Sequence, residues 1–110
     1  MASITVYTAT AVVTTPVSMD GLEKHLLQKG WFKTWYEEHS NGVVRYDMVS
    51  VSVGEPIDLD MVPGDDGNVS ELRVLARKEG VIETFQEVIA GIIEPFEVHR
   101  ADIGIIRRES

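Results

Sequence analysis

The chain has no cysteine, so neither a disulfide nor a thiolate metal site can hold its fold together. Its 110 residues are 44% apolar, which is enough to build one hydrophobic core at this length. We therefore expect a single domain over residues 1–110. The missing thiol also excludes thiol–disulfide exchange, because the reacting group in that chemistry is a thiolate.

The formal net charge is −8, and a charge of this sign opposes long-range attraction to nucleic acid or to anionic lipid. No apolar run approaches the 18 or so residues that a membrane span needs. The N-terminus lacks the basic and then apolar pattern of a signal peptide. We expect no nucleic-acid partner and no membrane span.

Local patterns predict the element order β-α-β-α-β-β-α. We expect strands over 4–9, 43–53, 81–90 and 95–99, helices over 20–30, 31–39, 70–80 and 102–108, and a loop over 54–68. One four-stranded mixed sheet follows, in which the first two strands are parallel and the last two antiparallel.

This element order is that of the thioredoxin fold, and several stretches resemble its glutaredoxin branch. The stretches are ITVYT (4–8), LEKHLLQKG (22–30), VRYDMVSVSV (44–53), SELRVLARKEGV (70–81), IETFQEV (82–88) and PFEVHRADI (95–103). The resemblance implies a thioredoxin-like α/β domain with a four-stranded mixed sheet flanked by helices. It also implies insertions at about 31–42 and 54–68, where the chain is longer than such proteins usually are.

The positions that carry redox chemistry in that family lack the necessary residues. Depending on the register, the C-x-x-C slot falls on residues 12–15, beginning at Val12, or on Thr15 to Ser18, and neither alternative contains sulfur. The cis-proline position of the family falls on Gln86. The resemblance therefore implies a redox-inactive relative that is not an enzyme and holds no cofactor.

Hydroxyl and imidazole groups give no stronger catalytic pattern. Thr15 and Ser18 lie near a predicted helix start, but no G-x-S-x-G motif surrounds them, so we interpret them as capping and turn residues. His25, His39 and His99 do not have the spacing of a zinc site. We expect no metal.

Four aspartates, Asp58, Asp60, Asp65 and Asp66, crowd the predicted loop. They do not follow the D-x-[DN]-x-[DN]-G pattern of a calcium loop, since Val62 stands in the third place. The pattern is typical of a solvated acidic loop, and docking to a basic partner remains an alternative.

Half of the aromatic residues fall within six positions, at Trp31, Phe32, Trp35 and Tyr36. On the predicted helix 31–39 this spacing makes one stripe. The stripe either covers the core of the domain or forms a contact surface, because tryptophan and tyrosine are enriched at binding hot spots.

The expected function is that of a redox-inactive thioredoxin-fold module for protein–protein contact or assembly, with a protein partner or a homo-oligomer. Its more specific version is a bacteriophage virion protein, located in the bacterial cytoplasm or in the virion, because such redoxins are common among phage products. The alternative is a regulator that binds a small, glutathione-like ligand without thiol chemistry.

Overall fold

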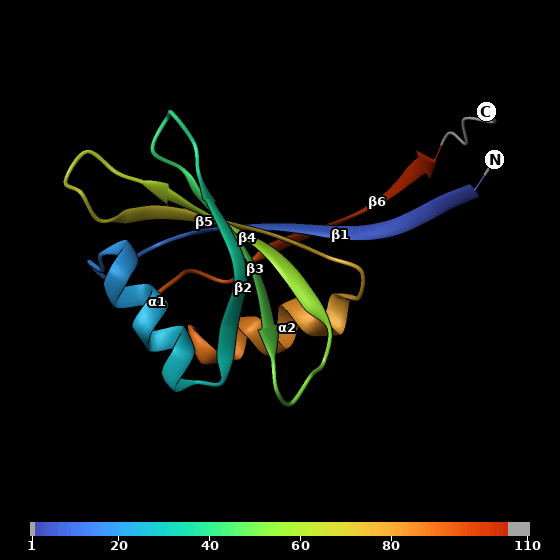
Figure 1. The fold of residues 1–110 in the computed structure, drawn as a ribbon, viewed down its shortest axis with the longest axis horizontal. Coiled ribbons are helices and arrows are strands. Elements are labelled where there is room, and N and C mark those ends of the chain that lie inside the picture. The colour runs from blue at the N-terminus through green and yellow to red at the C-terminus, as the bar shows by residue number, and fades with distance from the viewer. Residues whose placement is uncertain (1, 106–110) are drawn as a thin grey trace.

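The computed structural model describes residues 2–105, in the order β-α-β-β-β-β-α-β (Figure 1). The elements are β1 (Ala2–Val12), α1 (Met19–Gln28), β2 (Trp31–Glu38), β3 (Val44–Ser50), β4 (Pro56–Pro63), β5 (Val69–Ala76), α2 (Glu79–Val88) and β6 (Glu97–Ile105).

The strands form one six-stranded sheet in the order β2-β3-β4-β5-β1-β6, and every neighbouring pair is antiparallel. The expected four-stranded, thioredoxin-like mixed sheet is therefore wrong. Successive hairpins connect β2, β3, β4 and β5. The first two predicted strands correspond to β1 and β3, which are not neighbours in the sheet, so the expected parallel crossover between them does not occur.

Both helices pack on the same face of the sheet (Figure 1). Leu22 and Leu26 of α1 and Ile82 and Phe85 of α2 are fully buried against the inward side chains of the strands. The hydrophobic core fills this single interface between one sheet and one layer of helices. The other face of the sheet carries no helix within the described residues (Figure 1).

The prediction of strands at the start of the chain and at 43–53, and of a helix between them, is confirmed in outline. Ser18 caps α1, and its hydroxyl accepts a hydrogen bond from the backbone N–H of Gly21 at 3.0 Å. The predicted helix 31–39 is wrong, since this stretch is β2. Its aromatic and threonine residues favour a strand, and that preference outweighs the helical spacing.

Three further segments differ from the expectation. The predicted loop 54–68 contains β4, because Ile57, Leu59 and Met61 alternate with aspartates and point into the core. The predicted helix 70–80 is mostly β5, and the predicted strand 81–90 is mostly α2. Residues 81–88 form a helix and not a strand because Val81, Ile82 and Phe85 lie on one side of a helix and are buried there.

The predicted strand 95–99 lies at the start of β6, which continues to Ile105. The helix expected over 102–108 is therefore wrong for 102–105, and its remaining positions lie outside the described residues. The pairing of β1 with β5 ends at Tyr7 and Ala76. Residues 2–6 of β1 therefore pair with β6 alone. The two strands leave the body as a projecting ribbon (Figure 1).

Candidate functional site: the open face of the sheet

The face of the sheet opposite the helices, called the open face below, presents side chains in rows that cross all six strands. The registers place one row as Trp35, Asp47, Asp58, Leu75, Thr8 and His99, and the next as Glu37, Arg45, Asp60, Arg73, Thr10 and Glu97. Residues of one row point the same way, because directly opposed residues of neighbouring strands share a face.

A shallow depression of about 270 Å³ lies across the middle of the open face. Its floor is Leu75 with the backbone of β1 and β5, and its polar wall is formed by Thr8, Thr10, Arg45, Asp58, Asp60 and Arg73. The depression is smaller than the sites of about 300–1,000 Å³ that bury most of a small ligand.

Carboxylates outnumber arginines on this face, and nearby carboxylates already engage both arginines. Arg45 donates to Asp60 through Nε–Oδ1 at 2.8 Å and Nη2–Oδ2 at 3.1 Å. Arg73 donates to Glu71 of its own strand, with Nη2–Oε2 at 2.9 Å. The face therefore offers net negative charge to a partner.

Two carboxylates, Asp47 and Asp58, stand directly opposite each other on β3 and β4 of the open face. Partial burial, a hydrogen bond with Asp47 and the negative charge of Asp47 raise the pKa of Asp58 to about 6, against a smaller opposing effect of Arg45. Like charges in directly opposed positions destabilise a sheet. Groups perturbed in this way concentrate at functional sites.

The four aromatic residues expected to form one stripe are divided by the structure. Trp31 is 1% exposed and packs edge-to-face on Phe85, with 5.1 Å between ring centroids. Phe32 and Trp35, by contrast, are exposed on the open face, opposite Val49 and Asp47.

Tyr36 lies on the opposite side of β2 from Trp35. Its ring stacks on Tyr46 with 6.3 Å between centroids, and the Lys33 ammonium lies 4.7 Å from its centroid. The division arises because strand side chains alternate, and because a bulge between Lys33 and Trp35 shifts the register.

The four aspartates expected in one loop are also divided. Asp58 and Asp60 lie on β4, at the centre of the open face, whereas Asp65 and Asp66 lie in the turn between β4 and β5. Asp66 accepts a hydrogen bond from the backbone N–H of Asn68 at 3.0 Å, as in a turn. Within residues 2–105, no group of three acidic or histidine side chains is arranged to hold a metal ion.

The positions compared with a redox loop have structural contacts. Val12 ends β1, Thr15 donates its hydroxyl hydrogen bond to the carbonyl of Gly91 at 3.2 Å, and Ser18 caps α1. Gln86 lies on α2, where its side-chain oxygen accepts a hydrogen bond from the backbone N–H of Phe96 at 2.8 Å. The Thr15 contact joins the loop before α1 to the turn after α2, the Gln86 contact joins α2 to the segment before β6, and the Ser18 contact is local to α1.

Several residues of the open face were not identified from the sequence, among them Arg45, Asp47, Arg73 and Leu75. The alternation of apolar and polar residues, strict at 57–61 of β4 and partial in β3 and β5, was the available signal for the charged residues, because it separates a buried face from an outward face; the apolar Leu75 gives no such signal.

Scans against protein-family models, curated proteins and solved structures found no match to the chain. Neither helix of the described residues is long and apolar enough to cross a membrane. Function is therefore inferred from the chain's own residues.

Proposed function

We propose that the chain is a non-catalytic protein-binding module that contacts a protein partner through the open face of its sheet. The observation that carries the proposal is that no helix within residues 2–105 covers this wide face, which bears exposed aromatic residues and rows of carboxylates. Exposed aromatic side chains beside polar residues are typical of an interaction site.

The aromatic residues supply the apolar part of the contact. Trp35 is 47% exposed and Phe32 is 39% exposed, both near the β2 edge of the open face. Covering the exposed part of one tryptophan contributes about 2–3 kcal/mol at ~25 cal/mol/Å². Losing it would weaken binding by roughly 30- to 150-fold.

The carboxylates define the kind of partner. A face with net negative charge attracts a basic protein surface, and it repels the phosphates of nucleic acid. Asp47 is the neighbour of Trp35 across the strands, so an incoming lysine or arginine side chain would meet a carboxylate and an aromatic ring together.

We do not extend the proposal to a small, glutathione-like ligand. The depression is shallow, and Ser18 and Gln86 are engaged in contacts that hold the fold. The more specific expectation of a virion protein rested on a resemblance whose implied fold is wrong. The proposal therefore names the binding surface and the charge of the partner.

The experiment is affinity purification of the tagged chain from the cells that naturally make it, with quantitative mass spectrometry of the co-purified proteins. We expect Trp35→Ala and Asp47→Lys to lose the main co-purified protein. The matched controls Val51→Ala and Asp65→Lys change an exposed apolar residue and an exposed carboxylate in turns outside the six strands, and both should retain it. Equal recovery with all four variants would contradict the proposal.

A further inference from the structure

The strand β6 is a free edge of the sheet along its whole length of nine residues. Its register with β1 runs without interruption, so its outer edge is regular. At the opposite edge of the sheet, the register of β2 is broken by the bulge between Lys33 and Trp35. Bulges protect edges from pairing with another chain, and β6 within the described residues has none.

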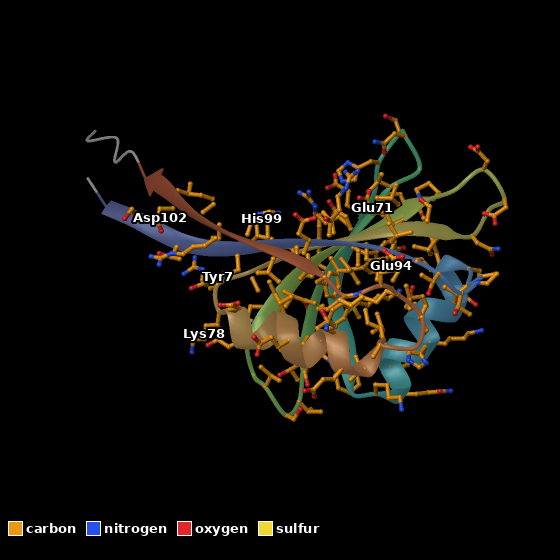
Figure 2. All side chains as sticks on the ribbon, turned by 180° about the vertical axis from the view of Figure 1, so that it is seen from behind. Tyr7, Glu71, Lys78, Glu94, His99 and Asp102 are labelled. Atoms are coloured by element: carbon orange, nitrogen blue, oxygen red, sulfur yellow. The ribbon has the colours of Figure 1, made fainter. Side chains whose placement is uncertain are left out.

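Half of β6 belongs to the projecting ribbon. Residues 101–105 pair only with residues 2–6 of β1, beyond the end of β5 (Figure 1). In Figure 2, Asp102 lies on this ribbon and His99 lies closer to the body. A two-stranded ribbon is marginally stable by itself in water, so a third strand along β6 would stabilise it.

We propose that β6 pairs antiparallel with β6 of a second copy of this chain, centred on Ala101. In that register Arg100 stands opposite Asp102 of the partner subunit, and the two-fold symmetry forms the same pair a second time. Arg100 and Asp102 lie two positions apart, so their side chains share one face of the strand and can meet across the new interface.

The charges of β6 select this register over its neighbours. Centring the pairing on Arg100 would place two arginines directly opposite each other, and centring it on Asp102 would do the same with two carboxylates. At the proposed centre, the small Ala101 faces itself, Val98 faces Gly104 of the partner subunit and His99 faces Ile103 of the partner subunit, so no like charges are directly opposed. Asp102 already accepts a hydrogen bond from Thr5 at 2.7 Å, which holds it in place on the ribbon.

The arrangement has a consequence for the whole assembly. A two-fold axis that relates directly opposed residues of antiparallel strands is perpendicular to the sheet, so both copies place their helices on one side. The ribbon of each copy then lies along the first residues of the other copy's β6. Both open faces point the same way on one continuous sheet, which would let the dimer bind two partner sites at once.

The test is the self-association of the full chain, measured by sedimentation velocity from about 10 to 300 µM. We expect the wild type to form a dimer. Arg100→Glu places a glutamate opposite Asp102 of the partner subunit, and Asp102→Arg places two arginines opposite each other. Each variant alone should dissociate on the order of tens of times more readily.

Mixing the two variants should restore a heterodimer, because both opposed pairs then have opposite charges. The controls Arg77→Glu and Glu83→Arg make the same charge changes at exposed sites off β6 and should dimerise as the wild type does. Restoration in the mixture also shows that each variant is folded.

Three results would overturn the inference. The first is a wild type that stays monomeric over the whole range. The second is self-association that neither substitution weakens, as expected if the free edge of β1 or the β2 edge were used instead. The third is a mixture that associates no better than its components.

Discussion

The opposed carboxyls of Asp47 and Asp58 make the stability of the fold depend on pH in an unusual direction. The pKa of Asp58 is raised to about 6 from 3.8, first by partial burial and then by the hydrogen bond and charge of Asp47. The folded chain therefore binds this proton more tightly than the unfolded chain does. The resulting stability is fully present below about pH 4 and is lost as the pH rises through 6.

Asp58→Asn removes this charge and should make the folded chain more stable at neutral pH. The Asp58 carboxyl is more than a third exposed, so solvent screening reduces the effect well below what the shift alone would give. We expect the free energy of unfolding to rise by about 1 kcal/mol at pH 7.5, which is the upper end of the range for directly opposed pairs in a sheet, and Tm to rise by about 4 °C. Below about pH 4 the gain should vanish, because Asp58 is then protonated in both the folded and the unfolded wild type.

The assay is urea unfolding followed by tryptophan fluorescence at a series of pH values between these two. Asp65→Asn is the matched control, since it makes the same charge change in the exposed turn between β4 and β5. The reasoning is refuted if Asp58→Asn is less stable than the wild type at pH 7.5, or if its gain is the same at both ends of the series.

Three further predictions concern the aromatic residues and the capping hydroxyl. Trp31→Ala should lower the free energy of unfolding by about 3–5 kcal/mol because it removes the ring packed on Phe85, whereas Trp35→Ala should change it by less than about 0.5 kcal/mol. Denaturant titration measures both, and equal losses would contradict the placement of Trp31 in the core and Trp35 on the open face. With single-tryptophan variants, acrylamide should quench the fluorescence of Trp35 strongly and that of Trp31 weakly, and similar quenching would place both on one face. Ser18→Ala should cost about 1 kcal/mol of stability by removing the cap on the N–H of Gly21, while leaving partner binding unchanged; a loss of binding at full stability would assign the hydroxyl another role.

The sequence predicted β1, β3, the helix α1 and the first residues of β6, because each has a clear local signal. In β4 and β5 the sequence contained a strand signal and a competing signal for another structure. Residues 57–61 alternate strictly between apolar residues and aspartates, which is a strong strand signal, but the prolines and glycines on both sides favoured a loop. In β5, Leu72, Leu75 and Ala76 also fit a helical spacing, although only Leu72 and Ala76 point into the core.

The segment that forms α2 was predicted as a strand, and the segment that forms β2 was predicted as a helix, for a related reason. The β-branched residues of 81–89 favour a strand, but the spacing of Val81, Ile82, Phe85 and Ile89 matches one face of a helix. In β2 the spacing is helical and the composition is that of a strand. Burial of one side against the sheet decided α2, whereas β2 is exposed except at Trp31 and is held by its pairing with β3; no local window contains either contact.

The candidate site depends on pairing between strands, which a single sequence does not specify. Asp47 and Asp58 lie in separate strands, and they become neighbours only through the register of the β3–β4 hairpin. Trp35 reaches the open face because of the bulge that precedes it. The charge and the aromatic content of the surface were visible in the sequence, but their arrangement in rows was not.

The central claim is that the partner contacts the open face of the sheet and not the surfaces outside it. The most direct measurement places a photo-crosslinking amino acid at position 37, beside Trp35 on the open face, or at position 83 on the exposed side of α2, and irradiates the cells that naturally make the chain. We predict a discrete protein adduct from position 37 and none from position 83. An adduct from position 83 alone, or the absence of any adduct at position 37, would contradict the claim.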